Sequence, residues 1–247
     1  MSSNPLISII TINYNNIEGL KKTIDSVMSQ SFSSYEHIII DGGSSDGSLD
    51  IIKNALKNKK YAAHVAYWCS EKDGGIYPAM NKGIERASGN FVYMLNSGDA
   101  LLPDVLSKIS PFLLDNLQKV VCAPVDNYSN GVFVKTSGMA AEHLSVGMLP
   151  HQGIFVPRLF HEKYGGYNDA YKICADREFM LRLRVNGVPF AHMPIIACAY
   201  DEGGVSSTAR LKMIKETYKI DCLMGKKKGA LYRYLKELIR YFLKFGR

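Results

Sequence analysis

Three short acidic segments follow apolar, β-branched stretches in the first hundred residues. Asp41 begins DGGSSDG, Asp73 lies within SEKDGGIY, and Asp99 ends LNSGD. Carboxylates together with a diphosphate are the usual ligands of Mg²⁺ or Mn²⁺ in proteins. The three segments therefore predict a site for a nucleotide diphosphate bridged by a divalent cation, because an acidic pocket by itself repels phosphate.

A single Asp after a strand is more often a turn former or a helix cap than a ligand-binding group. In an open parallel sheet, however, the carboxyl ends of neighbouring strands meet at one edge, where ligands bind. Polar residues end four predicted strands in succession, beginning with Thr11 and Asn13 after the first. This succession favours one shared site over four unrelated turns.

Two common nucleotide-binding motifs are missing from the sequence. The segment 41–47 does not fit G-x-G-x-x-G, and no G-x-x-x-x-G-K-[ST] occurs, which argues against a dinucleotide dehydrogenase and a P-loop NTPase. The five cysteines form no C-x-x-C pair, so neither a zinc site nor a disulfide framework is expected.

The elements that must position these residues alternate between strands and helices over the first 115 residues, which predicts βαβ units and a parallel sheet. Beyond that point the pattern is looser. The predicted strands are 6–12, 37–40, 65–69, 91–95, 120–123, 132–135, 153–156 and 189–200. The predicted helices begin after Asn15 or Asn16 and at Ser48, and cover 77–86, 177–185 and 230–247.

The composition is that of a folded α/β protein. The 247 residues suffice for one large domain or two small ones. With 47% hydrophobic and 21% charged residues, a sizeable core is expected and wholesale disorder is excluded. No apolar run reaches the ~18 residues of a spanning helix, and MSSNPLISII lacks the basic and apolar regions of a secretion signal.

The net charge of +7 is concentrated at the C-terminus. Residues 209–247 hold twelve Lys or Arg against three Asp or Glu, so the body over 1–208 is close to neutral. In 230–247 the basic residues recur at spacings of three and four, while Leu231, Leu235 and Phe242 share another face. The pattern predicts an amphipathic helix that lies on an anionic membrane surface. The alternative is a helix packed on the body with a solvated basic face.

Eight motifs give the chain a resemblance to the family-2 inverting glycosyltransferases. They cover about residues 5–210, and each is weak alone, whereas their order is specific. They are ISIITINYN, IIIDGGSSDGS, SEKDGGIYPAMNKGIERASG, LNSGD, HQGIF, GGYND, ADREFMLRL and GGVSS. The resemblance extends to bacterial enzymes that build O-antigen, capsule and colanic-acid repeat units. It implies the GT-A fold, an α/β fold with a Rossmann-like mixed sheet flanked by helices, followed here by a C-terminal helical extension.

On the donor side, the resemblance implies that four residues hold the base and ribose of a nucleotide, most often uridine: Thr11, Asn13, Asp41 and Asp73. The acidic metal-binding motif of the family falls on NSGD at 96–99, where Asn96 stands in place of a carboxylate and would contact the nucleotide.

Asp99 is the one carboxylate left in that motif, and it is expected to bind a divalent cation, Mn²⁺ or Mg²⁺. His151 is a further candidate ligand, although a lone histidine after a proline is more often structural or faces the substrate.

On the acceptor side, the resemblance implies that Asp176 is the general base and that Arg182 is its basic partner. Lys82 and Gln152 are expected to support the substrates. Glycosyl transfer needs an acceptor hydroxyl to lose its proton as it attacks the anomeric carbon, and a carboxylate within hydrogen-bond reach can take that proton. One base and one in-line displacement invert the anomeric centre. The GGVSS segment at 203–207 is either a flexible turn or a loop that closes over a substrate.

The implied partners are a nucleotide-sugar donor and a glycan acceptor linked to a polyprenyl diphosphate. The protein is then expected to be cytoplasmic and peripheral on the inner face of the bacterial cytoplasmic membrane. A non-catalytic relative that binds nucleotide sugars is the alternative, because the metal motif is depleted. A nucleic-acid-binding protein fits poorly, since the body is not basic.

Overall fold

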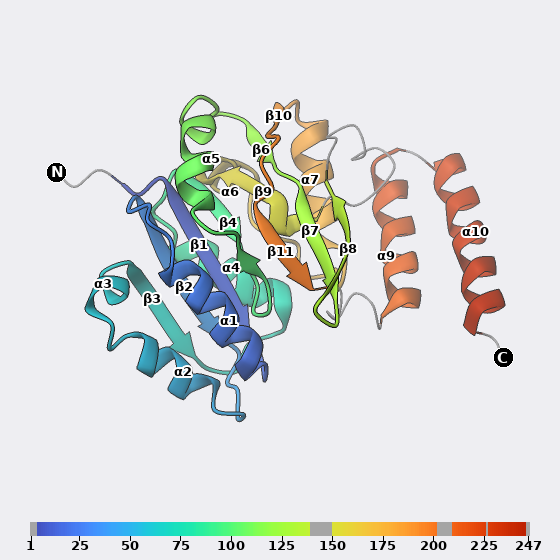
Figure 1. The fold of residues 1–247 in the computed structure, drawn as a ribbon. Coiled ribbons are helices and arrows are strands. Elements are labelled where there is room, and N and C mark those ends of the chain that lie inside the picture. The colour runs from blue at the N-terminus through green and yellow to red at the C-terminus, as the bar shows by residue number, and fades with distance from the viewer. Residues whose placement is uncertain (1–3, 139–149, 202–208, 226, 246–247) are drawn as a thin grey trace.

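The computed structural model describes residues 4–138, 150–201, 209–225 and 227–245 (Figure 1). Within these residues, seven strands form a sheet in the order β10-β6-β9-β4-β1-β2-β3, and four more form a sheet in the order β5-β11-β7-β8. The strands are β1 (Ile7–Asn13), β2 (Tyr35–Asp41), β3 (Val65–Ser70), β4 (Phe91–Met94), β5 (Ala100–Leu101), β6 (Val120–Cys122), β7 (Val125–Ser129), β8 (Val132–Ser137), β9 (Ile154–Pro157), β10 (Phe190–His192) and β11 (Cys198–Asp201). The helices are α1 (Ile17–Met28), α2 (Ser48–Ala55), α3 (Lys59–Ala62), α4 (Ile76–Arg86), α5 (Val105–Leu114), α6 (Arg158–Tyr164), α7 (Ala175–Val185), α9 (Arg210–Leu223) and α10 (Lys227–Phe245), with the 3₁₀ turn η2 (His151–Gly153).

The first four predicted strands are confirmed as β1 to β4, and they are neighbours in the large sheet. β1 pairs in parallel with β2 and β4, and β2 pairs in parallel with β3. Their carboxyl ends therefore meet at one edge, as the polar strand ends predicted. β9 runs antiparallel to both β4 and β6, which makes the sheet mixed and confirms the predicted fold class.

Helices cover both faces of the large sheet because successive strand residues point to opposite sides. Ile10 and Ile38 face a core completed by α4, α6, α7 and α9. Ile9 and Ile39 face a second core completed by α1, α2, α3 and α5. The result is a three-layer α/β/α arrangement (Figure 1).

The predicted strand over 189–200 is wrong as one element. It divides into β10 and β11, which belong to different sheets. Pro194 lies between them, and a proline cannot donate a hydrogen bond within a ladder. This change of sheet carries Tyr200 and Asp201 to the same side of the molecule as the end of β4.

The C-terminal region forms two helices side by side, α9 and α10 (Figure 1). The predicted helix at 230–247 corresponds to α10. α9 lies within the extension over 209–247 that was expected to be helical, although no separate helix was predicted there. α9 places Ile220 fully inside the first core. α10 packs on α9 through the rings of Tyr218 and Tyr234, with centroids 4.7 Å apart. None of the helices in the described part of the chain is long and apolar enough to cross a membrane.

Gly153, which ends η2, lies where two chain segments approach closely. Its carbonyl oxygen accepts from Ala123 N at 2.7 Å, and an added Cβ would collide with the Ala123 carbonyl oxygen. Gly153→Ala is therefore expected to lower the free energy of unfolding by about 1–3 kcal/mol, measured by denaturant titration. Gly229→Ala is the control, because Gly229 is exposed within α10 and alanine favours a helix. Equal stability of both variants would contradict this expectation.

Candidate active site

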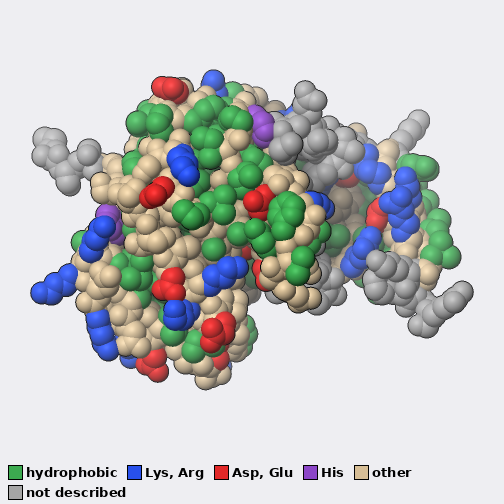
Figure 2. Space-filling view, in the orientation of Figure 1, with side chains coloured by type: hydrophobic (Ala, Val, Ile, Leu, Met, Phe, Trp, Pro, Cys, Tyr) green, Lys and Arg blue, Asp and Glu red, His purple; other side chains and the backbone are tan. Residues whose placement is uncertain are grey.

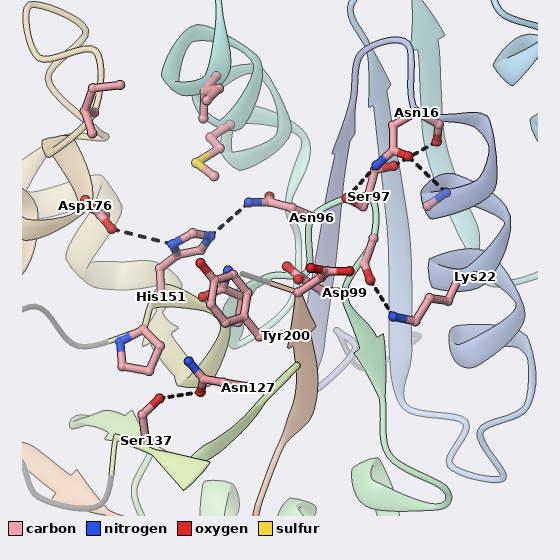
Figure 3. A pocket seen from close by; sticks show the side chains of 18 of the residues that line it. Asn16, Lys22, Asn96, Ser97, Asp99, Asn127, Ser137, His151, Asp176 and Tyr200 are labelled. Atoms are coloured by element: carbon pink, nitrogen blue, oxygen red, sulfur yellow. Dashed lines mark hydrogen bonds and ion pairs between the residues drawn. The ribbon is translucent and has the colours of Figure 1, made fainter. Parts of the chain in front are cut away.

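A cleft of about 980 Å³ opens beside the carboxyl end of β4 (Figure 3). Its wall combines residues of α1, the NSGD turn, η2, α4, α7 and the small sheet. Among the predicted site residues, five lie in this wall: Asn96, Asp99, His151, Gln152 and Asp176. The structure thus brings together residues from positions 96–99, 151–152 and 176, which are far apart in the sequence.

The NSGD turn presents Asp99 to the cleft. Gly98 adopts φ +107°, a left-handed conformation that favours glycine. The Thr23 hydroxyl on α1 donates to Asp99 O at 2.6 Å and accepts from Gly98 N at 3.0 Å, which fixes the turn. Lys22 Nζ donates to Gly98 O at 2.9 Å and adds a positive charge beside it. Thr23 and Lys22 thus hold the NSGD turn, and no sequence pattern had singled out either residue.

Asp99 is only 4% exposed, and this burial raises the pKa of its carboxyl group to about 7. His151, hydrogen bonds from the Asp201 backbone and the Gln152 side chain, and Lys22 oppose the shift. Oδ2 of Asp99 is nevertheless buried without a hydrogen-bond partner among the described residues. A buried carboxylate oxygen in this condition is stabilised when a cation binds it.

Asn96 offers a second unpaired oxygen in the same turn. Its Nδ2 donates to His151 Nε2 at 2.9 Å, while Oδ1 is buried without a partner among the residues described. Oxygen donors are what Mg²⁺ and Mn²⁺ prefer, so Asn96 Oδ1 and Asp99 Oδ2 fit such an ion. No group of three His, Cys, Asp or Glu that could hold a metal occurs among the described residues. A diphosphate and water would therefore have to supply most of the ligands.

His151 lies between Asn96 and Asp176 (Figure 3). Because Nε2 accepts from Asn96, a neutral ring carries its proton on Nδ1, which faces Asp176 Oδ2 at 3.5 Å. The ring thus connects the NSGD turn to the start of α7.

Asp176 occupies the first turn of α7, where the helix dipole favours a negative charge. The residue is 9% exposed and lines the cleft. Its Oδ1 is 3.2 Å from the Tyr77 hydroxyl and accepts from Arg177 N at 2.8 Å. Burial raises the pKa of Tyr77 above its ordinary value, so this hydroxyl keeps its proton. The carboxylate is held in place with one side turned toward the cleft.

Asn13 and Asp41 end the adjacent strands β1 and β2, in register with each other. Asn13 Nδ2 donates to Asp41 Oδ1 at 2.8 Å, and the hydroxyls of Ser44 and Ser70 donate to the same carboxylate at 2.6 Å each. Burial opposes ionisation, but these hydrogen bonds hold the pKa of Asp41 below its ordinary value. Asp73 lies beside this group, since a Cβ on Gly42 would be 2.9 Å from Asp73 Oδ2. Asn13, Asp41 and Asp73 therefore gather along the same sheet edge, outside the wall of the large cleft.

Thr11 differs from its predicted role as a nucleotide contact. Its side chain is fully buried, and its hydroxyl donates to Leu95 O at 2.8 Å and lies 2.9 Å from His37 Nε2. The next outward residue at the end of β1 is Asn13, so Thr11 supports the strand from within and does not reach the surface.

Arg182 does not pair with Asp176. It binds Glu178 at 2.9 Å and the carbonyl oxygens of Tyr164 and Gly166. Six residues of α-helix turn a side chain by about 600°, which leaves it on another face. The i, i+4 spacing from Glu178 to Arg182 was the signal for the pair that forms.

Lys82 on α4 pairs with Glu71 at 2.8 Å, two residues before Asp73, so it lies near Asp73. The GGVSS segment at 203–207 lies outside the described residues.

Comparisons of the sequence identify a family. The chain matches the model of glycosyl transferase family 2 over residues 8–175. An uncharacterized glycosyltransferase of Mycobacterium tuberculosis is 34% identical over 224 residues, which cover 84% of this chain and 79% of the relative. A PGL/p-HBAD biosynthesis glycosyltransferase of Mycobacterium bovis is 28% identical over 216 residues, which cover 83% of this chain and 80% of the relative.

Solved structures share the fold. Staphylococcus aureus TarS 1–349 in complex with UDP-GlcNAc superposes with a TM-score of 0.72 at 17% identity, over 96% of this chain and 72% of the TarS 1–349 chain. A mannosyltransferase from Pyrobaculum calidifontis in complex with GDP-Man and Mn²⁺ gives a TM-score of 0.66 at 14% identity, over 97% of this chain and 76% of the mannosyltransferase chain. The fold is therefore of the GT-A type. Together with the family match over most of its length, this shows that the chain belongs to glycosyl transferase family 2.

Proposed function

We propose that the chain is an inverting glycosyltransferase that moves a sugar from a UDP-sugar donor to a hydroxyl of a glycan acceptor. The observation that carries the proposal is the shared cleft. Asp99 and Asp176 both line it, and Asn96 and His151 connect their two segments. Asp99 lies in a turn where two buried side-chain oxygens have no hydrogen-bond partner among the described residues, and Asp176 lies in the first turn of α7.

On the donor side, Asn13, Asp41 and Asp73 would receive the uridine, and Asp99 with Asn96 Oδ1 would hold a divalent cation. Such an ion, when bound, neutralises the charge that leaves with the diphosphate. Lys22 lies beside Asp99 and stabilises the same developing charge. The solved complexes of TarS with UDP-GlcNAc and of the mannosyltransferase with GDP-Man and Mn²⁺ support a nucleotide sugar as donor.

On the acceptor side, Asp176 would take the proton of the attacking hydroxyl. Arg177 N donates to Oδ1 of Asp176, and Nδ1 of the His151 ring lies 3.5 Å from Oδ2, so both oxygens have a neighbour that orients the carboxylate. A single attack opposite to the leaving diphosphate inverts the anomeric centre, so an α-linked donor gives a β-linked product.

We further propose that the acceptor is a lipid-linked intermediate of a surface polysaccharide or glycolipid. The printed names of two relatives support this class: a PGL/p-HBAD biosynthesis glycosyltransferase, and a putative teichuronic acid biosynthesis glycosyltransferase of Bacillus subtilis that is 38% identical over 111 residues.

The proposal is tested by screening nucleotide sugars for a shift in melting temperature with and without Mn²⁺, and then assaying the donors found. We expect a UDP-sugar to stabilise the protein in a Mn²⁺-dependent way and to be consumed with release of UDP. A protein that binds the UDP-sugar but never releases UDP, with any acceptor glycan offered, would instead be the non-catalytic relative.

The surface of α10 supports the proposal that the protein binds peripherally to the inner face of the cytoplasmic membrane. Six apolar residues of this helix are between 46% and 79% exposed and occupy one continuous arc: Leu231, Tyr232, Leu235, Ile239, Phe242 and Leu243. Lys236 and Arg240 border that arc in the helical sequence, while Tyr234 on another side of α10 packs on Tyr218 of α9. Hydrophobic side chains lie along the outer edge of this part of the molecule, with Lys and Arg side chains beside them (Figure 2). An exposed apolar arc flanked by cations matches an anionic bilayer interface, and we propose that the basic extension over 209–247 docks there through α10.

We expect the double variant Leu235→Glu, Phe242→Glu to bind phosphatidylglycerol vesicles at least about tenfold more weakly, because two apolar side chains no longer enter the interface. Sedimentation with vesicles measures this. Leu114→Glu, Leu117→Glu is the matched control, since these exposed residues lie at and after the end of α5, far from α10 (Figure 1). Undiminished vesicle binding by the α10 variant would contradict the proposal. So would a wild-type protein that binds no vesicles but forms a dimer that the α10 substitutions disrupt.

A further inference from the structure

α9 carries two buried carboxylates that reach the segment around Asp176. Glu216 is 7% exposed and Asp221 is 2% exposed. Neither is part of any predicted site, and both lie beyond the residues matched by the family model. A helix that only covered a core would need apolar residues at these positions, because burying a carboxylate costs free energy unless it is paired.

Glu216 binds the backbone of the turn that leads into α7. Its carboxylate accepts from the backbone N–H groups of Lys172 at 2.9 Å, Ile173 at 2.9 Å and Cys174 at 3.0 Å. The carbonyl oxygen of Ile173 accepts from the Tyr77 hydroxyl at 2.7 Å. The turn is therefore held from two directions, by α9 and by α4, immediately before Asp176.

Asp221 fixes the residue that follows Asp176. Arg177 Nη2 donates to Asp221 Oδ1 at 2.7 Å, with side chains that are 6% and 3% exposed. Arg233 on α10 donates to the other oxygen, Oδ2, at 2.8 Å, and its side chain is 41% exposed. Burial disfavours the charged form of Asp221, yet the hydrogen bonds from Arg177 and Arg233 hold its pKa below the ordinary value.

These contacts enclose Asp176 on both sides along the chain. Residues 172–174 are held by Glu216, and residue 177 is held by Asp221, so the backbone at 176 has little freedom to rotate its carboxylate out of the cleft. Lys172 and Ile173 of this turn line that cleft, and so does Met213 of α9. The C-terminal helix α9 thus takes part in the site and is more than an attachment to it.

We propose that Glu216 and Asp221 are positioning residues that hold the start of α7 so that Asp176 faces the acceptor. This inference rests on the proposed function, in which Asp176 is the base. A displacement of about 1 Å of a catalytic group can cost about a hundredfold in rate. The residues proposed to receive the uridine, Asn13, Asp41 and Asp73, lie outside the wall of this cleft, so we expect UDP affinity not to depend on this turn.

The experiment measures turnover and KM for the donor found in the nucleotide-sugar screen, together with UDP affinity in Mn²⁺, for Glu216→Gln, Glu216→Asp and Asp221→Asn. Glu216→Asp keeps the buried charge and shortens the side chain by one methylene, so it decides the question if the Gln variant does not fold. Hydrogen exchange of the peptide containing residues 172–174 is followed in parallel. Lys219→Gln is the matched control, because Lys219 is an exposed residue of the same helix, α9.

We expect turnover to fall about a hundredfold in the Glu216 and Asp221 variants, with donor KM and UDP affinity unchanged. Hydrogen exchange at 172–174 should be faster in the Glu216 variants, and Lys219→Gln should keep wild-type turnover. Folded Glu216 and Asp221 variants with wild-type turnover would overturn the inference. If Asp176→Asn also retained full turnover, the proposed function itself would have failed, so the two failures can be told apart.

Discussion

Asp176→Asn is expected to lower the turnover of sugar transfer by about 100- to 10,000-fold, the range that general base catalysis contributes. The amide preserves the shape of the side chain, and its oxygen can still accept from Arg177 N, so the fold is retained. It cannot accept the proton of the acceptor hydroxyl. Since the residue acts on the acceptor, the affinity for UDP in the presence of Mn²⁺ should stay within about twofold of the wild type.

Initial-rate assays and calorimetric titration with UDP measure the two quantities separately. Glu178→Gln provides the control, because Glu178 lies on the same helix two residues later and pairs with Arg182 away from the cleft. Loss of UDP binding in Asp176→Asn, or an equal loss of turnover in Glu178→Gln, would speak against the base.

Asp99→Asn is expected to abolish the gain in UDP affinity that Mn²⁺ provides and to lower turnover by about 100- to 1,000-fold, the usual effect of losing one stabiliser of a developing charge. Asp99 supplies a carboxylate oxygen that has no hydrogen-bond partner in the described part of the chain, and an amide oxygen is a weaker ligand for a divalent cation. UDP titrations with and without Mn²⁺ measure the effect. Asp25→Asn is the control, because Asp25 is an exposed aspartate on α1 that pairs with Lys21.

The Asp99 carboxylate also predicts that the effect of Mn²⁺ on UDP affinity depends on pH. Burial raises the pKa of Asp99 to about 7, so the group is increasingly protonated as the pH falls below that value. Binding of a cation must then displace a proton. We therefore expect the Mn²⁺-dependent gain in UDP affinity to be larger at pH 8 than at pH 6. A gain independent of pH, or one that survives in Asp99→Asn, would place the cation elsewhere.

The strand ends were the most predictable part of the molecule. Short apolar, β-branched runs gave β1 to β4 to within about two residues, and the parallel pairing of β1 with β2 places Asn13 beside Asp41 as their shared position at strand ends requires. Sheet edges of this kind follow from local pattern and from general rules of connection.

Contacts between distant segments were not predictable from local pattern. The His151 ring meets both Asn96 and Asp176 only because β9 inserts antiparallel between β4 and β6. α9 has no marked apolar face in its sequence, since it buries Glu216 and Asp221 together with Ile220. Arg182 had a visible partner at i+4 spacing in Glu178, and that geometry decides its position.

A crystal structure of the protein with UDP and Mn²⁺, with the metal located by its anomalous scattering, would test the proposed roles of Asp99 and Asp176 together. We expect a manganese peak about 2 Å from Asp99 Oδ2 that also contacts the diphosphate. We also expect uracil beside Asp41 and Asp73, and the Asp176 carboxylate facing the same cleft. A nucleotide bound elsewhere, or a manganese ion that does not touch Asp99, would contradict these roles.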